Sequence, residues 1–310
     1  MTELIPLAAC VLIAFGIGSN DTSNALGICI GVGVIKLRKA VLLFGCFVFI
    51  GIMLQGQGVM KTVGKDLLEV NVTILSISLS ISALLIILSN WRKLPLSTHQ
   101  VIIGSLTGSG VASGVDVNLL SLFKIALSWI ISPLAAFFFA LIFYRMMEKT
   151  LSKLSLFRIE RILRILLLIS GVLIAYNTGA NELATVLGPA IHSGLMGKMP
   201  SFLSGSFFVF LGAVLLSHRV IETVGKGITA LDPYSGFAAQ FGAGICVLLF
   251  TSLGMPISTT YCIIGGISGV GMSKGVETVR ITLVKKIIAN WVFAPSLAFL
   301  ICFVVMRLLI

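Results

Sequence analysis

The sequence predicts an all-α polytopic membrane protein made of two inverted-topology repeats of about five membrane segments each, with broken helices at the midplane. Composition is the first observation behind this prediction. Of the 310 residues, 57% are hydrophobic and 11% are charged, which leaves too little polar surface to cover a soluble globule. The second observation is that apolar runs of close to 20 residues recur, each long enough to cross roughly 30 Å of hydrocarbon. These runs are apolar on every side, so the alternating strands of a membrane barrel are not expected.

Five membrane segments are expected in the first half, and the second half should repeat them. The first segment follows Glu3 with no lysine or arginine before it, which indicates a retained span rather than a cleaved signal peptide. The six cysteines lie in apolar segments without C-x-x-C spacing, which favours small buried side chains over a metal site or a disulfide. The expected segments are residues 4–35, 40–60, 72–90, 95–113 and 121–146.

An internal repeat runs through nearly the whole chain. Matching residues are 161 positions apart in three places: Asn20 and Asn181, Thr62-Val63-Gly64-Lys65 and Thr223-Val224-Gly225-Lys226, and Pro95-x-Ser97-Thr98 and Pro256-x-Ser258-Thr259. The offset becomes 162 at Trp129 and Trp291 and at Pro133 and Pro295. This period is far too long for a solenoid, whereas duplicated halves are typical of secondary transporters.

The positions of the basic residues predict the orientation. Five crossings in each half would invert the second half relative to the first, and a start outside the cell would place 17 of the 22 lysines and arginines on the cytoplasmic side. The exceptions are Lys61, Lys65, Lys124, Lys198 and Arg307. We therefore expect a multi-pass protein of the cell membrane with both termini outside, in which residues 1–146 form the first repeat, 147–164 a basic cytoplasmic linker and 165–310 the second repeat.

A carboxylate occupies the same place in each half. The polar stretch Gly18 to Gly27 contains Asp21 and falls about 15 residues into the first span, where its glycines and small polar residues predict a break in the helix. The equivalent stretch of the second half contains Glu182. Because a carboxylate at the centre of a membrane helix costs about 2.5 to 3.5 kcal/mol, an accidental pair is improbable.

A second repeated motif predicts a site for an oxyanion. Pro95-Leu96-Ser97-Thr98 and Pro256-Ile257-Ser258-Thr259-Thr260 each precede a glycine-rich apolar helix. Proline followed by Ser and Thr is typical of a helix start, where hydroxyls cap free N–H groups. Free N–H donors, hydroxyls and the positive end of the helix dipole suit phosphate or sulfate.

The absence of lysine and arginine from the expected midplane suggests how such an anion would be neutralised. A cation bound at Asp21 and Glu182 would balance its charge, which predicts anion–cation symport. Carboxylate, Asn side chains and free carbonyls suit sodium, whereas a proton would bind the carboxylate itself. Because bare carboxylates repel an anion, the cation should bind first or together with it.

The chain resembles the inorganic phosphate transporter (PiT) family, over essentially its whole length, in G-S-N-D-T-S-N-A, G-A-N-E-L-A-T-V, P-L-S-T-H and P-I-S-T-T. The resemblance implies that an ion and substrate site is lined by Asn20, Asp21, Asn24, Asn181 and Glu182, and that Ser97, Thr98, Ser258, Thr259 and Thr260 contact the oxyanion. It also implies transport of phosphate, or of sulfate, with sodium or protons. The chain departs from the family pattern at Glu182 and Thr185, where Asp and Asn are expected, and at His99, Gln100 and Tyr261.

Several alternatives stay open. Phosphate can donate a hydrogen bond to a carboxylate and sulfate cannot, which favours phosphate, but a sulfate permease or a passive anion channel would use the same polar residues. His99 could relay protons or serve as a helix cap. The glycine-rich spans could pack two copies into a homodimer. We expect neither an enzyme nor a nucleic-acid partner nor a cofactor besides the coupling cation, because hydrolase motifs and a P-loop are missing and the basic residues are scattered.

Overall fold

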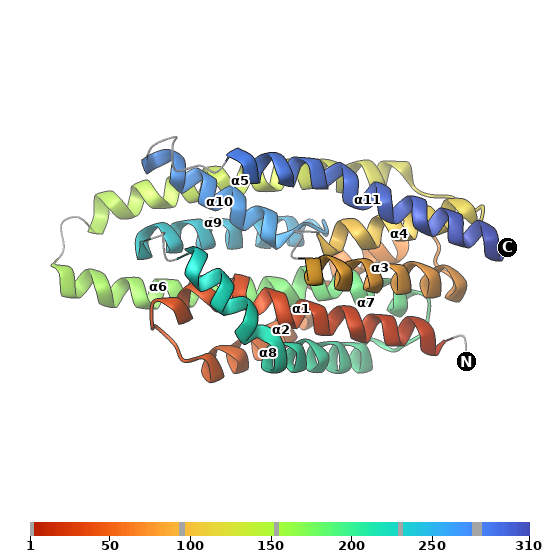
Figure 1. Ribbon diagram of the computed structural model, residues 1–310, viewed down its shortest axis with the longest axis horizontal. Coiled ribbons are helices and arrows are strands. Elements are labelled where there is room, and N and C mark those ends of the chain that lie inside the picture. The colour runs from red at the N-terminus through yellow and green to blue at the C-terminus, as the bar shows by residue number, and fades with distance from the viewer. Residues whose placement is uncertain (1–2, 93–96, 152–154, 229–231, 275–280) are drawn as a thin grey trace.

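The computed structural model describes residues 3–92, 97–151, 155–228, 232–274 and 281–310. Every regular element in these ranges is helical (Figure 1). The first half holds α1 (Leu4–Gly31), α2 (Leu37–Lys61), the π-helical segment η1 (Thr62–Asp66), α3 (Val72–Arg92), α4 (Thr98–Ala112) and α5 (Leu119–Leu151). The second half holds α6 (Leu156–Asn177), the π-helical segment η2 (Thr178–Leu183), α7 (Ala184–His192), α8 (Lys198–Ile228), α9 (Pro233–Ser252), α10 (Thr259–Lys274) and α11 (Ile281–Leu309).

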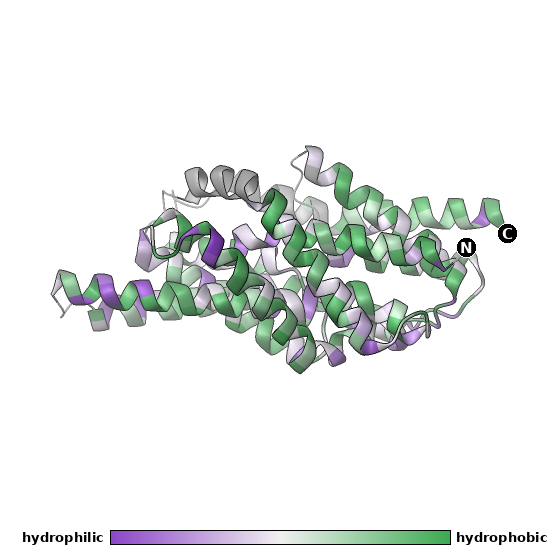
Figure 2. Ribbon diagram, turned by 90° about the horizontal axis from the view of Figure 1, so that it is seen from below, coloured by the Kyte–Doolittle hydropathy of each residue, from purple (hydrophilic) through white to green (hydrophobic). Residues whose placement is uncertain are grey.

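The predicted all-helical, polytopic membrane architecture is confirmed. Seven helical stretches of the described residues are long and apolar enough to cross a bilayer. Large apolar side chains such as Leu54, Phe138 and Leu203 lie exposed on the outside of the bundle, where lipid rather than water can cover them. Hydrophobic residues accordingly dominate the middle of the helices in Figure 2, and hydrophilic residues gather at the end where α5 passes into α6.

Helix α1 is continuous, so the predicted break at Gly18 to Gly27 is wrong. The hydroxyls of Ser19, Thr22 and Ser23 donate to the carbonyl oxygens of Gly16, Gly18 and Asn20, at 2.8, 2.7 and 2.6 Å. Bonds of this kind, to the preceding turn, satisfy a small polar side chain without opening the helix. In the second half the equivalent stretch is wound as η2, which joins α6 to α7 without a gap.

The breaks in the helices lie in two hairpins instead. The segment 95–113, predicted to cross the membrane, contains the 15-residue helix α4, about 22 Å long at 1.5 Å per residue and so shorter than roughly 30 Å of hydrocarbon. Helix α4 packs beside α3, and α10 packs beside α9 in the same way. In Figure 1, α4 and α10 both begin near the middle of the molecule. Pro95, Lys93, Lys153 and Arg280 lie outside the described residues.

Glycines of each half pack directly against the backbone of the other half, at equivalent positions of the repeat. A Cβ added at Gly18 of α1 would lie 1.8 Å from the carbonyl oxygen of Val209 in α8, and a Cβ at the equivalent Gly179 would lie 1.9 Å from that of Val48 in α2. Helix α4 packs on α11 and α10 on α5 with the same reciprocity. Figure 1 shows the start of α1 and the end of α11 at one end of the molecule, and the end of α5 and the start of α6 at the other. The contacts bring the middle of α1 beside the starts of α4 and α10.

Candidate functional site

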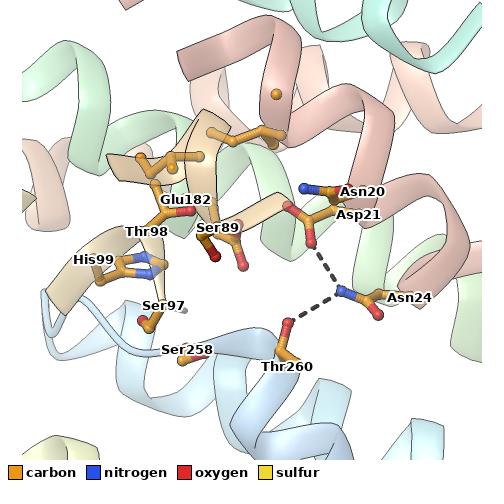
Figure 3. Close-up of a pocket in the computed structure, with 13 residues that line it drawn as sticks. Asn20, Asp21, Asn24, Ser89, Ser97, Thr98, His99, Glu182, Ser258 and Thr260 are labelled. Atoms are coloured by element: carbon orange, nitrogen blue, oxygen red, sulfur yellow. Dashed lines mark hydrogen bonds between the residues drawn. The ribbon is translucent and has the colours of Figure 1, made fainter. Parts of the chain in front are cut away.

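A polar cavity of roughly 160 Å³ lies where the predicted motifs meet (Figure 3). It is lined from α1, the end of α3, the start of α4, η2 and the start of α10. Eight of the ten predicted site residues line it: Asn20, Asp21, Asn24, Ser97, Thr98, Glu182, Ser258 and Thr260. Because a water occupies about 30 Å³ in the liquid, a space of this size suits a small polyatomic ion.

Helix α1 supplies one wall of the cavity. Asn20, Asp21 and Asn24 are spaced three and four residues apart, which places them on one face of a helix, and all three face the cavity in Figure 3. Nδ2 of Asn24 donates to Oδ1 of Asp21 at 2.8 Å and to the hydroxyl oxygen of Thr260 at 3.1 Å. Asn24 thereby positions the carboxylate and ties α1 to the start of α10.

The two repeated carboxyl groups meet at this cavity. Asp21 is 7% exposed and Glu182, which lies on η2, is 4% exposed. Their side chains interact with each other directly. The salt bridges of the described residues join other groups, so neither carboxylate has a lysine or arginine partner there. Two adjacent carboxylates in a membrane interior can both stay ionised only if a cation lies between them.

Hydroxyl groups from α4 and α10 form the opposite wall. Ser97 is the N-cap residue of α4, but its hydroxyl makes no capping hydrogen bond, so the cap predicted there is wrong. Ser258 does cap α10, because its hydroxyl oxygen accepts from the backbone N–H of Tyr261 at 3.4 Å. Because Ser97 does not cap α4, the backbone N–H donors and the positive end of the helix dipole at its start are available to an anion as far as the described residues show.

Two buried polar atoms at the cavity lack a partner among the described residues. They are Oγ of Ser97 and Nε2 of His99, whose side chains are 4% and 1% exposed. Both residues line the cavity and point into it in Figure 3. A buried polar atom left unpaired costs about 1 to 3 kcal/mol, so a ligand that pairs with both atoms would be favoured.

Asn181 and Thr259, the two remaining predicted residues, are fully buried beside the cavity and do not line it. Nδ2 of Asn181 donates to Oγ1 of Thr251 at 2.7 Å and to the carbonyl oxygen of Met255 at 2.9 Å, while its Oδ1 accepts from the N–H of Ile257 at 3.1 Å. Asn181 therefore fixes the turn that connects α9 to α10. Thr259 lies against the carboxyl group of Glu182, toward which its hydroxyl and its backbone N–H both point.

Ser89 is a polar lining residue that sequence reasoning missed. It lies near the end of α3 and is 4% exposed. The same span also contains Ser76, Ser78, Ser80 and Ser82, so nothing in its spacing distinguishes Ser89 from serines that bond to neighbouring helices. Only the hairpin between α3 and α4 brings it to the site.

Comparisons with known proteins agree with this architecture. The family model described as the phosphate transporter family matches residues 17–302. A predicted phosphate permease of Methanocaldococcus jannaschii is 39% identical, covering 95% of this chain and 94% of that protein. The sulfate permease CysP of Bacillus subtilis is 31% identical, covering 99% of this chain and 88% of that protein.

A solved structure described as the sodium-dependent phosphate transporter has the same fold. It superimposes with a TM-score of 0.87 at 23% identity, over 99% of this chain and 98% of that one. The family model covers nearly the entire chain, and two relatives above 30% identity extend over almost its full length. By sequence and by fold, the chain belongs to the phosphate transporter family.

Proposed function

We propose that this protein is a secondary active transporter that imports inorganic phosphate in symport with a cation, sodium or a proton. The observation that carries the proposal is the cavity between α1, α4, η2 and α10. It combines the two carboxyl groups of Asp21 and Glu182 with the unpartnered Oγ of Ser97 and Nε2 of His99. One wall can therefore hold a cation and the other an oxyanion.

The cation would bind at the α1 and η2 side. Hard cations prefer oxygen ligands, and Asp21, Glu182 and the amide of Asn20 offer them within one cavity. Asn24 and Asn181 were predicted as further ligands; the first holds Asp21 in place and the second holds the α9–α10 turn. A bound sodium ion, or a proton on one carboxylate, would remove the repulsion that otherwise keeps an anion out. Cation binding should therefore precede anion binding or accompany it.

The phosphate would bind at the hydroxyl side. Ser97, Thr98, Ser258 and Thr260 present donors around the cavity, and the start of α4 adds free backbone N–H groups. Hydrogen phosphate also carries a proton of its own, for which a carboxylate oxygen is a good acceptor. Co-binding of anion and cation couples their transport, because neither is well satisfied alone.

We propose that alternating access opens this site first to one side of the membrane and then to the other. The reciprocal contacts of Gly18 with Val209 and of Gly179 with Val48 support a two-fold relation between residues 1–146 and 165–310, as expected for inverted repeats. The hairpins α3–α4 and α9–α10 meet at the site from opposite ends of the molecule (Figure 1). With the basic linker 147–164 on the cytoplasmic side, both termini would lie outside.

Sulfate import is the second candidate function. It is favoured by one specific observation, the 31% identity to a protein named as a sulfate permease. Both ions are tetrahedral dianions, so hydroxyls and N–H groups alone would not separate them. Carboxylate acceptors at the site favour the ion that carries a proton.

Radiolabelled uptake into proteoliposomes tests the proposal. An inward sodium gradient and an inward proton gradient are imposed separately, and unlabelled sulfate serves as the competitor. We expect phosphate to accumulate above its external concentration under one of the two gradients, with little competition from sulfate. Accumulation of sulfate instead would establish the second candidate, and uptake that stops at equilibrium would show a channel.

A further inference from the structure

A second cavity, of roughly 380 Å³, lies at the end of the molecule toward which α7 and the start of α8 point in Figure 1, the end that holds both termini. Three lysines and one histidine are among the residues that line it: Lys61 at the end of α2, Lys65 on η1, His192 at the end of α7 and Lys198 at the start of α8. None of these residues belongs to the central site.

Close packing of η1 on α7 holds these four residues near one another. A Cβ added at Gly64 would lie 2.4 Å from the carbonyl oxygen of Gly188 and 2.8 Å from Nδ1 of His192. Gly64 is part of the Thr62-Val63-Gly64-Lys65 motif, so the approach brings Lys65 beside α7. The wider turn of a π-helix at η1 adds to this local shape, and such segments occur often at functional sites.

Positive charge is in excess at this cavity. Lys61 pairs with Asp66, with 3.6 Å between the charged atoms. Lys65 and Lys198 form no salt bridge with any residue in the described ranges. The three lysines are also three of only five basic residues that the proposed orientation places outside the cell. That orientation otherwise concentrates lysine and arginine on the cytoplasmic side. Three lysines in one outer cavity are therefore an exception, which an anionic ligand would explain.

The histidine adds a preference among anions. Nδ1 of His192 lies 3.0 Å from the carbonyl oxygen of Gly188, which can only accept, so this nitrogen carries the proton. In the neutral ring Nε2 is then an acceptor. Free hydrogen phosphate bears a proton that it can donate to Nε2, whereas sulfate and the phosphodiester of a lipid headgroup bear none.

We propose that Lys61, Lys65, Lys198 and His192 form a binding site for a phosphate group on the outer face, separate from the central site. This placement rests on the orientation in the proposed function. The phosphate group comes either from the free ion, which the site would concentrate before transport, or from the headgroup of an outer-leaflet lipid. The lysines would hold either ligand by charge, and Nε2 of His192 would add a hydrogen bond to the free ion only.

Equilibrium binding of radiolabelled phosphate to the full chain in phospholipid-free detergent tests this site. The measurement uses Ser97→Ala/Ser258→Ala protein, in which central binding is weakened, and adds Lys65→Gln/Lys198→Gln. The matched control adds Lys124→Gln/Arg307→Gln, the other two outer basic residues, which do not line the cavity. We expect each lysine removed from the cavity to raise the apparent Kd about fivefold, while the control leaves it unchanged. Sulfate should displace phosphate only weakly, and His192→Ala should abolish that preference.

Displacement by a soluble short-chain phosphatidylglycerol separates the two sources. If the lipid displaces radiolabelled phosphate at a lower concentration than unlabelled phosphate does, the ligand is a lipid headgroup. If the lipid needs a higher concentration, the ligand is the free ion. Equal phosphate binding with and without the cavity lysines, or an equal loss in the control, would overturn the proposal. Because no gradient is involved, a protein that binds phosphate here but fails to accumulate it refutes the transport proposal and leaves the outer site standing.

Discussion

The hydroxyl of Tyr261 donates a hydrogen bond to Oε1 of Gln100 at 3.4 Å, and these two residues occupy equivalent positions in the repeat. Asp21 and Glu182 are also equivalent, and they too interact with each other. Equivalent residues of two repeats can meet only near the axis that relates the repeats. Both pairs therefore support a pseudo-two-fold axis through the central cavity, where a substrate would stay in contact with both halves during a rocking motion.

Replacing Asp21 by Asn should abolish coupled accumulation of phosphate. The change keeps the size of the side chain and the contact with Asn24 but removes the charge that would hold the cation. We expect gradient-driven accumulation in proteoliposomes to fall by more than about tenfold, the factor that corresponds to 1.4 kcal/mol. Glu69→Gln, which neutralises an exposed carboxylate, is the control. Unchanged accumulation in the Asp21 variant would remove the proposed coupling site.

Replacing both Ser97 and Ser258 by Ala should weaken phosphate affinity and leave the cation dependence intact. The two hydroxyls line the cavity, and that of Ser97 lacks a partner among the described residues. Hydrogen bonds to a charged group contribute about 1.5 to 3 kcal/mol, so the KM for uptake should rise about tenfold or more. Ser206→Ala is a matched control, because Ser206 is also buried and without a partner in the described part of the chain but does not line the cavity. An equal rise in the control would show that the effect is not specific to the site.

The sequence predicts most of the lining of the central cavity, because charged and polar residues at mid-membrane are costly and so stand out from their apolar surroundings. Asp21, Glu182, Ser97 and Ser258 were found in this way and by their repetition. Ser89 was missed because a serine in an apolar span is inexpensive and common.

The path of the chain was predicted less well, for two physical reasons. Small polar residues can favour a helix break because their side chains compete for backbone groups, but in α1 the hydroxyls bond to carbonyl groups of the preceding turn, as Thr22 does to Gly18. Apolar composition also does not distinguish a crossing from a hairpin arm. Helices α3 and α4 are both apolar, and only their packing against each other shows that the chain turns back between them.

Replacing Gly18 by Ala should disrupt the contact between α1 and α8. The added Cβ would lie 1.8 Å from a backbone carbonyl oxygen that cannot move independently of its helix. Overpacking of a tight core costs about 1 to 3 kcal/mol or more, so we expect a clearly lower midpoint of thermal unfolding in detergent. Gly31→Ala tests the same substitution at the end of the same helix, where nothing lies within 4 Å of the added atom. A similar loss in both variants would point to helix flexibility rather than to helix packing.

Replacing Asn181 by Ala should loosen the turn before α10. The substitution deletes hydrogen bonds to Thr251, Met255 and Ile257 and leaves buried backbone groups unpaired. Each unpaired group costs about 1 to 3 kcal/mol, so the unfolding midpoint should fall and hydrogen exchange in residues 253–258 should become faster. Faster exchange confined to other parts of the chain would contradict the assigned role. Thr185→Val, which removes a hydrogen bond from α7 to the adjoining turn of η2 and none to the α9–α10 turn, provides the comparison.

The ion pair between Asp232 and Lys274 should stabilise the α9–α10 hairpin in a pH-dependent way. Asp232 caps α9, accepting from the N–H of Ser235 at 3.0 Å, and Lys274 is the last residue of α10. Burial disfavours the charged form of Asp232, but hydrogen bonds from Lys274 and Ser235 outweigh burial and hold the pKa of this carboxyl below its usual value of 3.8. The stabilisation is therefore fully present above pH 3.8 and is lost as the pH falls through the lower pKa of the folded state.

A double-mutant cycle measures this pair directly. Asp232→Asn, Lys274→Gln and the double variant are compared in thermal unfolding at pH 7 and at a pH about two units below the usual pKa of the carboxyl. Because the Asp232 side chain is 41% exposed, solvent screens the pair, and we expect a coupling free energy of about 1 kcal/mol or less at pH 7. Protonation of Asp232 should bring the coupling close to zero at the low pH. Coupling that persists unchanged at low pH would mean that the two residues interact through the packing of α9 on α10 and not through their charges.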